Sequence, residues 1–452
     1  MSVQYKTGRR SVLKKLALSG LTFSGVSGLS PVLAQTGKSA KVRHWDVVVI
    51  GGGPGGVPAA VAAARNGARV LLVERAAYLG GMATTALVQP YMRYNTKDTL
   101  LTRGLFEEFV DLLRDNGAIL ENRRTFDAEP MKWLLDRFVI DAGVDLLLHT
   151  RAMGVMMDGA NVRAVKLFHK GGLEDVSADI VIDSTGDGDI SAWAGAPVEV
   201  GRHQDNACQP MTTAFRMANV DITRMPERAE INRLYDAAKA AGEVTNPREN
   251  VLIFMTVHDD VVHFNTTRIV GKSALDGWTL TEAEVEGRRQ VSDMVTFLKK
   301  RIAGFENAYL IKSGPEIGVR ESRRIMGEYV LTADDVLSAH HFDDGIACAC
   351  YDIDIHNPAG TGTVIKRLKE GTYYKIPYRC LVPKNVDNLI VASRCISSTH
   401  EAHSSLRVMP IVWSIGQAAG TAASMCVANK TVPRSVNSGE LREKLISQGA
   451  FV

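Results

Sequence analysis

The sequence predicts a mixed α/β protein with a Rossmann-type nucleotide-binding domain and a second, α+β domain for a substrate. Three observations support this prediction: a buried strand that runs into a glycine-rich turn and a helix, a run of short strands in the middle of the chain, and a late strand followed by a helix of small residues. With 452 residues, of which 45% are hydrophobic and 23% charged, the chain is long enough for two or more domains.

Residues 1–34 are predicted to be an export signal rather than part of the fold. The segment begins with basic residues and then becomes rich in Leu, Ala, Ser and Gly up to Ala34, a small residue of the kind that precedes a cleavage site. Gly8-Arg9-Arg10-Ser11-Val12-Leu13-Lys14 resembles the twin-arginine export motif, which a bacterial export machinery reads. We therefore expect an exported, periplasmic protein whose mature form is not stably inserted in a membrane. A membrane anchor or a disordered tail is the alternative.

The distribution of charge argues against nucleic-acid binding. The formal net charge of +3 includes five basic residues and no acidic residue within residues 1–34. Without those five, 48 basic residues stand against 50 acidic ones, and the rest of the chain has a net charge of −2. No metal site is predicted either, because the cysteines lack a zinc-binding spacing and the histidines of His400-Glu401-Ala402-His403 are three residues apart instead of four.

The strongest local signal begins with Trp45–Ile50, a continuous apolar run typical of a buried parallel strand. A glycine-rich turn, an alanine-rich helix over 57–66 and a second strand over 68–73 follow, and Glu74 ends that strand, which is the order of a dinucleotide site. The glycines allow a tight turn and a close approach of the backbone to a pyrophosphate, while Glu74 can accept hydrogen bonds from ribose hydroxyls. The predicted contacts are Gly51, Gly53, Pro54, Gly55, Gly56 and Glu74.

The next segment favours FAD over NAD as the nucleotide. Residues 75–85 contain Gly80-Gly81 and resemble the second glycine motif of glutathione-reductase-type flavoproteins, which wraps around FAD. An ordinary surface turn is the alternative. The resemblance implies cofactor contacts from Arg75, Gly80, Gly81, Met82, Thr84 and Thr85.

Later segments are similar to the same class of flavoprotein. Residues 155–168 and 173–182 are predicted as short antiparallel strands of a meander, and a turn that resembles the one closing over the cofactor phosphates follows them. After a strand over 388–392, a helix begins near Pro410, and its N-terminus together with Arg407 is expected to stabilise the negative charge of a reduced flavin. The cofactor contacts implied here are Thr185, Gly186, Asp187, Arg394, Gly416, Gln417 and Ala418.

Together these motifs resemble the bacterial FAD-dependent oxidoreductases that are sometimes named xanthan-lyase-related. The resemblance extends from about Asp46 to Ala428, and it implies FAD as the cofactor and a redox activity, but not lyase chemistry. One departure is Ser393, where the family usually has glycine, which implies a slightly altered loop rather than loss of FAD. The segments that carry the resemblance are 80–84, 317–325, 376–383 and 394–420.

The predicted FAD-binding domain is discontinuous, because its strands are scattered along the chain. It comprises residues 44–90, 140–205 and 380–435. A helical segment over 91–139, with a helix expected within 97–116, borders the cavity. The substrate domain over 206–379 is expected to contain paired strands over 251–257 and 261–269 and an amphipathic helix over 281–302.

His400 is the predicted acid–base residue, oriented by Glu401, because a hydroxyl that is oxidised beside a flavin needs a base within hydrogen-bond reach. His400, His403 and Arg407 are expected on one loop beside the flavin ring, and a purely structural role of His400 is the alternative. Arg320 and Arg323 could hold an anionic or polyhydroxylated ligand through forked hydrogen bonds, or form internal ion pairs with Glu321 or Glu328. The predicted substrate residues are Arg320, Arg323, His356 and Tyr374.

Three functions are compatible with these residues. The leading one is an exported FAD-dependent oxidoreductase that transfers a hydride between a small, hydroxylated organic substrate and flavin N5 and exchanges electrons with a separate carrier or oxygen. The second is a flavin-dependent reductase of an activated double bond. The third is a non-redox isomerase or hydratase that retains FAD as a structural group.

Overall fold

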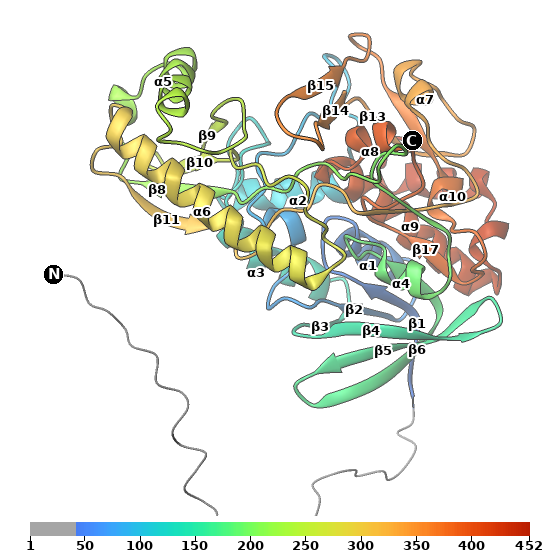
Figure 1. The fold of residues 1–452 in the computed structure, drawn as a ribbon. Helices are drawn as coiled ribbons and strands as arrows, with labels where there is room; N and C mark the ends of the chain where they lie inside the picture. The colour runs from blue at the N-terminus through green and yellow to red at the C-terminus, as the bar shows by residue number, and fades with distance from the viewer. Residues whose placement is uncertain (1–41) are drawn as a thin grey trace, which may run out of the picture. The chain divides into compact units, whose positions relative to one another are not determined.

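The computed structural model describes residues 42–452, which form one compact unit, and the predicted export signal lies outside these residues. The main sheet has seven strands in the order β3-β2-β1-β6-β5-β4, and β17 pairs with β6 as well (Figure 1). The parallel strands are β1 (Arg43–Ile50), β2 (Val70–Val73), β3 (Asp145–Leu147), β6 (Gly172–Asp183) and β17 (Leu389–Val391). This arrangement confirms the predicted α/β class and its Rossmann-type sheet.

The carboxyl ends of the parallel strands meet at one edge of the sheet. Ile50 at the end of β1 pairs with both Val73 of β2 and Asp183 of β6, and Val391 of β17 pairs with Asp183 from the other side. Ligands of open α/β sheets bind at this edge, where the strands end and the connecting loops begin. The register of four strands, whose end residues Ile50 and Val391 are 341 positions apart, therefore places the glycine loop, Glu74 and the 184–187 turn together.

Helix α9 (Met409–Asn429) packs against α1 (Gly56–Arg65) over this sheet. A Cβ atom at Gly420 would lie 2.0 Å from the carbonyl oxygen of Ala59, so the two helices approach at backbone distance. Among the described residues, α9 is the one helix that is long and apolar enough to span a membrane by length and composition, and 83% of its apolar window is buried in the core. Its hydrophobicity is thus explained by its place beside α1, where both helices pack on the sheet.

The predicted meander is present, with one change. The run expected as a single strand over 155–168 divides into β4 (Arg151–Asp158) and β5 (Asn161–His169), which pair antiparallel. Gly159 in the connecting turn has a φ of 58°, in the left-handed region that tight hairpin turns need. The alternating sequence predicts the strands but does not show where the chain turns back.

A second sheet has the order β11-β8-β10-β9 and packs on two helices. The expected pair of strands is confirmed in shorter form, and the expected long helix begins a turn earlier because the side chain of Asp276 accepts a hydrogen bond from the backbone N–H of Thr279. The elements are β8 (Phe215–Ala218), α5 (Arg228–Ala240), β9 (Ile253–Met255), β10 (Val262–Phe264), α6 (Gly277–Arg301) and β11 (Tyr309–Ser313).

The remaining elements connect the two sheets or extend the first core. The helix expected within 97–116 is present only as α2 (Leu105–Asp115), since Gly104 precedes it with a φ of 64°. The domain boundaries remain predictions, although residues 325–386 contribute to the same core as the first sheet. The other elements are α3 (Ala128–Ile140), α4 (Asp189–Trp193), β7 (Val198–Val200), β12 (Arg323–Ile325), α7 (Ala333–Leu337), β13 (Gly345–Ala349), β14 (Ile353–His356), β15 (Thr363–Lys366), β16 (Tyr374–Pro377), α8 (His400–Leu406) and α10 (Ser438–Ser447).

His263 on β10 makes the second core sensitive to acid. The side chain is fully buried, neither ring nitrogen has a hydrogen-bond partner within residues 42–452, and burial lowers the pKa of His263 from 6.5 to about 3. The unfolded chain therefore takes up a proton below about pH 6.5 that the folded protein excludes, so the stabilising effect is present above that pH and is lost as the pH falls.

We expect the free energy of unfolding to decrease by about 1.4 kcal/mol per pH unit below about pH 6.5 on account of His263 alone. Urea unfolding at pH 7 and pH 5 measures this decrease. The His263→Leu variant, which cannot take up the proton, should lose about 2 kcal/mol less than the unsubstituted protein over that interval. Equal losses in the two proteins would contradict the prediction.

Candidate active site

A cleft of about 670 Å³ opens at the edge where β1, β2 and β6 end. One wall consists of the glycine loop, Glu74 and the 184–187 turn, and the opposite wall includes Glu316, Val319 and the first turns of α6. Its volume falls within the range of about 300–1,000 Å³ that is usual for small-molecule and cofactor sites.

The glycine loop leaves room and backbone donors for a phosphate group. A Cβ atom at Gly51 would lie 2.5 Å from the carbonyl oxygen of Ser184, so the turn requires glycine there. A Cβ atom at Gly53 would meet only the Cα of Gly81, at 3.9 Å, and would stand in the cleft. The N-terminus of α1 has no side-chain cap and no acidic residue in its first turn. Free N–H groups at a helix N-terminus and an open backbone approach are what a pyrophosphate needs.

Glu74 follows β2 and points its carboxylate to the same loop. Its Oε2 accepts a hydrogen bond from the backbone N–H of Gly52 at 2.7 Å, and its Oε1 accepts one from Ala76 at 2.7 Å. Each carboxylate oxygen has a further lone pair, so the predicted hydrogen bonds from ribose hydroxyls remain available. Arg75, the next residue, crosses the cleft and pairs with Glu316, with 2.8 Å between Nη1 and Oε1.

The 184–187 turn is stabilised by hydrogen bonds to Asp183, which is fully buried. Its carboxylate accepts hydrogen bonds from Thr185 and Ser191, and burial raises the pKa of Asp183. Asp187 pairs with Arg394 at 2.9 Å, and the Nε of Arg394 is buried without a hydrogen-bond partner among the described residues. The cleft therefore offers a cationic donor at this turn, which suits a cofactor phosphate.

Most of the predicted cofactor residues line the cleft, and the others support the loops behind it. Gly56, Gly80, Thr84 and the three predicted positions of α9 are not part of the lining. The Thr84 hydroxyl donates to the carbonyl oxygen of Leu79 at 2.7 Å, and Gln417 Oε1 accepts from the backbone N–H of Leu105 at 3.0 Å. The lining residues are Gly51, Gly53, Pro54, Gly55, Glu74, Arg75, Gly81, Met82, Thr85, Thr185, Gly186, Asp187 and Arg394.

The predicted catalytic pair is not formed. His400 lies on a helix, α8, instead of a loop, and its Nδ1 is 2.8 Å from Glu321 Oε1. Glu401 cannot orient it, because adjacent residues of a helix point in different directions. Neither His400 nor His403 is part of the cleft lining, and only Arg407 of the predicted catalytic residues is. The alternative of a structural His400, in a buried network with Glu321, is therefore favoured.

Two of the predicted substrate residues have other partners. Arg323 lines the cleft, but its Nη1 pairs with Asp189 Oδ1 at 2.8 Å, as the ion-pair alternative expected with a different acid. The prediction for Tyr374 is wrong, because its side chain is fully buried and its hydroxyl lies 2.7 Å from Ser405 Oγ. Tyr374 lies on a buried strand and is a core residue.

The other two predicted substrate residues join a group of arginines at the side of the cleft. Arg248 Nη1 and Arg268 Nη2 each lie 3.3 Å from His356 Nδ1. Arg407 Nη2 lies 3.4 Å from Gln209 Oε1, which also accepts a hydrogen bond from the backbone N–H of His356 at 3.2 Å. Figure 1 shows the position of β14, which ends at His356, above the sheet. We call this group the basic cluster: Arg248, Arg268, Arg320, Arg407 and His356.

Arg320 belongs to the basic cluster through its charge as well as its position. Its Nη1 donates to the carbonyl oxygen of Pro210 at 2.7 Å, next to Gln209. Burial lowers the pKa of Arg320 well below its usual value, and the positive charges of Arg407 and Arg248 lower it further. Burial and the surrounding arginines also lower the pKa of His356, so its imidazole is neutral. Arg248, Arg268 and Gln209 were not predicted, because no motif surrounds them.

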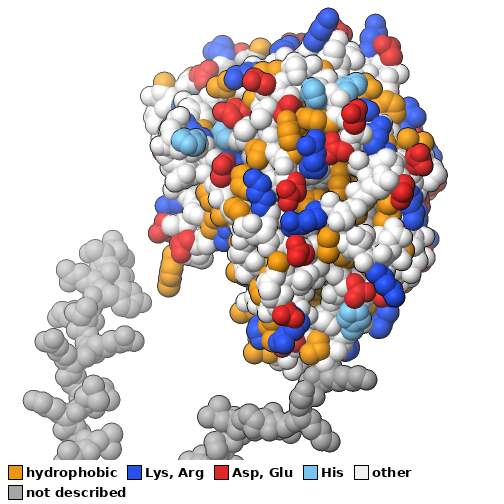
Figure 2. All heavy atoms as spheres, turned by 90° about the vertical axis from the view of Figure 1, so that its right-hand side faces the viewer, with side chains coloured by type: hydrophobic (Ala, Val, Ile, Leu, Met, Phe, Trp, Pro, Cys, Tyr) orange, Lys and Arg blue, Asp and Glu red, His pale blue; other side chains and the backbone are white. Residues whose placement is uncertain are grey.

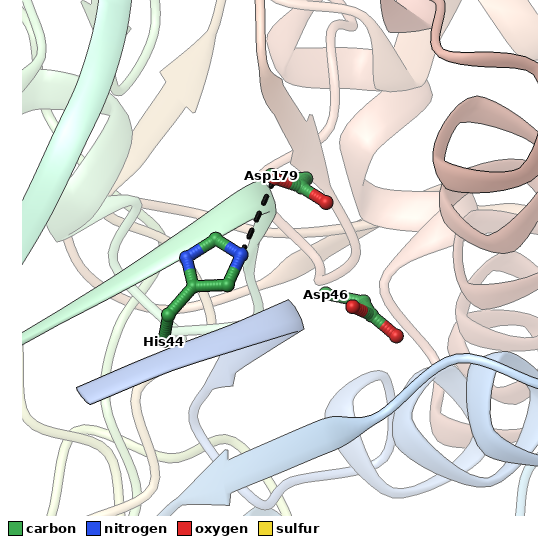
Figure 3. Close-up of side chains that lie close together, drawn as sticks. All are labelled: His44, Asp46 and Asp179. Carbon is green, nitrogen blue, oxygen red and sulfur yellow. Dashed lines mark ion pairs between the residues drawn. The ribbon is translucent and has the colours of Figure 1, made fainter.

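On one face of the described residues, positive and negative side chains are intermingled. On the face drawn in Figure 2, Lys and Arg side chains alternate with Asp and Glu side chains. His44, Asp46 and Asp179, drawn in Figure 3, have possible ligand atoms within 4.8 Å of one another. His44 and Asp46 lie near the start of β1, at the opposite end from the glycine loop, and Asp179 lies on β6 beside them, with 3.4 Å between His44 Nε2 and Asp179 Oδ1. We assign them no role.

Comparison with known proteins places the chain among flavoproteins. A family model described as FAD dependent oxidoreductase matches residues 46–445. The digeranylgeranylglycerophospholipid reductase of Thermoplasma volcanium is 27% identical over 197 residues, which are 40% of this chain and 48% of that protein. Reductase 1 of the same name from Methanopyrus kandleri is 34% identical over 160 residues, 32% of this chain and 40% of that protein. The chain thus matches about half the length of these curated relatives or less.

The solved structures that match this chain have lower sequence identity to it. The flavin-dependent brominase Bmp2 is 13% identical, with a TM-score of 0.48 over 88% of this chain and 83% of that one. A geranylgeranyl bacteriochlorophyll reductase-like protein from Thermoplasma acidophilum is 14% identical, with a TM-score of 0.44 over 90% of this chain and 84% of that one.

Proposed function

Because this chain belongs to the FAD dependent oxidoreductase family, we propose that it transfers a hydride between a small organic substrate and FAD held in the cleft. The residues of the cleft fit this cofactor: an open glycine loop, an uncapped helix N-terminus, a carboxylate at the end of β2, and at the 184–187 turn a guanidinium Nε with no hydrogen-bond partner among the described residues. FAD supplies the redox chemistry, by accepting or releasing a hydride at its isoalloxazine ring.

The observation that carries the proposal is the position of Arg407. This residue lines the cleft directly before α9, whose N-terminus lacks a side-chain cap. On its other side, Arg407 approaches Gln209 and the carbonyl oxygen of Asp354, and so belongs to the basic cluster. The guanidinium of Arg407 therefore belongs both to the cofactor cleft and to the basic cluster. The positive charge of this cluster can orient a substrate. The positive end of α9 and Arg407 would stabilise negative charge that develops on the cofactor.

The chain's own residues hold the reactants, and the titratable bases on the cleft wall are carboxylates, among them Glu284 and Glu316. His356 orients the substrate instead of accepting a proton, because its Nδ1 already faces two guanidinium donors. His400 does not serve as the base either, because its Nδ1 is bonded to Glu321.

The opposite direction is the second candidate. The curated relatives are named as reductases, which supports a reaction in which a hydride passes from reduced flavin to an activated double bond. In either direction electrons are exchanged with a separate carrier or with oxygen.

Export by the twin-arginine route, and with it a periplasmic location, is part of the proposal and depends on the motif within residues 1–34.

An anaerobic absorption spectrum tests the proposal. After reconstitution with FAD, the flavin bands should bleach when one member of a panel of alcohols, sugars and hydroxy acids is added, because a donor reduces the cofactor. If the bands stay oxidised with every donor but the reduced protein is reoxidised by an enone or an unsaturated acid, the reductase direction is supported. A protein that holds no flavin after reconstitution would contradict the proposal altogether.

A further inference from the structure

The basic cluster carries more positive charge than its neighbours neutralise. Of its four arginines, only Arg268 takes part in an ion pair within 4.0 Å among residues 42–452, at 3.3 Å from Glu249. Asp354 is the other acidic neighbour, and its Oδ2 accepts a hydrogen bond from the hydroxyl of Tyr351 at 2.9 Å. Four guanidinium groups, two carboxylates and a neutral imidazole leave a net charge of +2.

Several donors of this region also lack a partner. The Nε atoms of Arg268 and Arg407 and the Nε2 of Gln209 are buried and make no hydrogen bond within the part of the chain that the structure describes. Arg248 and Gln209 are 4% and 1% exposed, so water does not replace the missing partners freely. Buried polar groups and buried charges are normally paired, and a concentration of unpaired donors indicates a ligand with acceptor atoms.

His356 adds a directed donor to the cluster. Guanidinium groups can only donate, so the two arginines that lie 3.3 Å from Nδ1 require this nitrogen to accept. The proton of the neutral imidazole is therefore on Nε2. This atom is 3.8 Å from Asp354 Oδ2, too far for a hydrogen bond, and its N–H remains available.

We infer that the basic cluster binds the substrate of the proposed flavin reaction, and that this substrate is a small organic dianion. Its oxyanion group, a carboxylate or a phosphate ester, would contact Arg320, Arg407 and the Nε2–H of His356. The inference rests on the proposed function, since Arg407 connects the cluster to the cleft. Arg248 and Arg268 hold His356 in the required tautomer, and two negative charges would balance the net charge of +2.

Calorimetric titration of the FAD-loaded full chain tests the inference. The probes are malonate, glycerol phosphate and the neutral malonamide. At least one dianion should bind, and malonamide should bind at least about 10-fold more weakly, since charge-assisted hydrogen bonds are about twice as strong as neutral ones. Arg320→Gln and Arg407→Gln should each weaken dianion binding by about 10-fold or more. Arg379→Gln, an exposed arginine paired with Asp344 at 2.9 Å, is the matched control and should change nothing.

Each outcome supports or contradicts the inferred dianion site. Binding of malonate alone identifies a carboxylate substrate, and binding of glycerol phosphate alone identifies a phosphate ester. Equal affinity for malonate and malonamide, or unchanged affinity in both arginine variants, would overturn the inference. A flavin that is bleached by an uncharged donor in a protein that binds neither dianion would overturn the inference and leave the proposed function standing. Failure to take up FAD would instead remove the proposed function itself.

Discussion

Replacement of Gly53 by valine is expected to abolish FAD binding while the apoprotein keeps its stability. The added side chain has no protein atom closer than 3.9 Å to its Cβ position, and it would occupy volume in the cleft that the cofactor needs. Gly53 does not have a positive φ, so the substitution introduces no left-handed strain. We expect FAD affinity to fall by about 100-fold or more, and the unfolding free energy of the apoprotein to change by less than about 0.5 kcal/mol.

Gly420→Ala is the matched comparison and should show the reverse pattern. Its Cβ would lie 2.0 Å from the carbonyl oxygen of Ala59, so α9 and α1 must separate. Overpacking of this kind destabilises a protein by about 1–3 kcal/mol or more. Fluorescence titration with FAD and urea unfolding of both apoproteins measure the two effects. If Gly53→Val bound FAD as tightly as the unsubstituted protein, the cleft could not be the cofactor site.

Removal of the Glu321 carboxylate is expected to destabilise the protein strongly. Glu321 is 1% exposed and accepts from three groups: Arg324 Nη1 at 2.7 Å, His400 Nδ1 at 2.8 Å and the backbone N–H of Gln209 at 3.0 Å. The side chain of Arg324 is 2% exposed, so Glu321→Ala leaves a buried charge without its closest partner. Breaking a buried pair in this way costs about 3–5 kcal/mol.

Urea or thermal unfolding of the Glu321→Ala variant measures the loss. Glu230→Ala serves as the control, because Glu230 pairs with Arg233 at 2.6 Å on the exposed face of α5. Exposed pairs of this type contribute little, and the control should unfold close to the unsubstituted protein. If both variants unfolded alike, the network of Glu321, Arg324 and His400 would not be a major source of stability. Glu321 also accepts a hydrogen bond from the backbone N–H of Gln209, which contacts the basic cluster. The variant therefore also tests whether this hydrogen bond helps to hold the basic cluster in place.

The elements that the sequence predicted well are those encoded by neighbouring residues. The strand that ends at Ile50, the glycine loop, α1 and β2 are consecutive, and each is specified by apolar runs, glycines and a terminal acid. The first turn of α9 is similarly marked by Pro410. Boundaries were less well predicted where a single capping contact decides them, as for Asp276 at the start of α6.

The side-chain partners were predicted less well, because they come from distant parts of the chain. His400 was assigned to its neighbour Glu401, yet its partner Glu321 lies 79 residues away. His400, His403 and Arg407 are predicted on one loop, but the Thr399 side chain caps a helix that turns His400 away from the cleft. Periodicity and motifs describe the backbone of such a segment, and they do not determine which way a side chain faces in the folded molecule.

By itself, the sequence determined the cofactor-binding half of this protein. Its glycines, strand ends and acidic terminus form a local pattern whose chemistry depends on the backbone of adjacent residues. Only the tertiary structure decided the polar site beside it. Arg248, Arg268, His356 and Arg407 come together because β14, the end of α8 and the loops at the second sheet meet beside the cleft, which Arg407 lines. Electrostatic balance is a property of distances in space, and these residues are up to 159 positions apart in the chain.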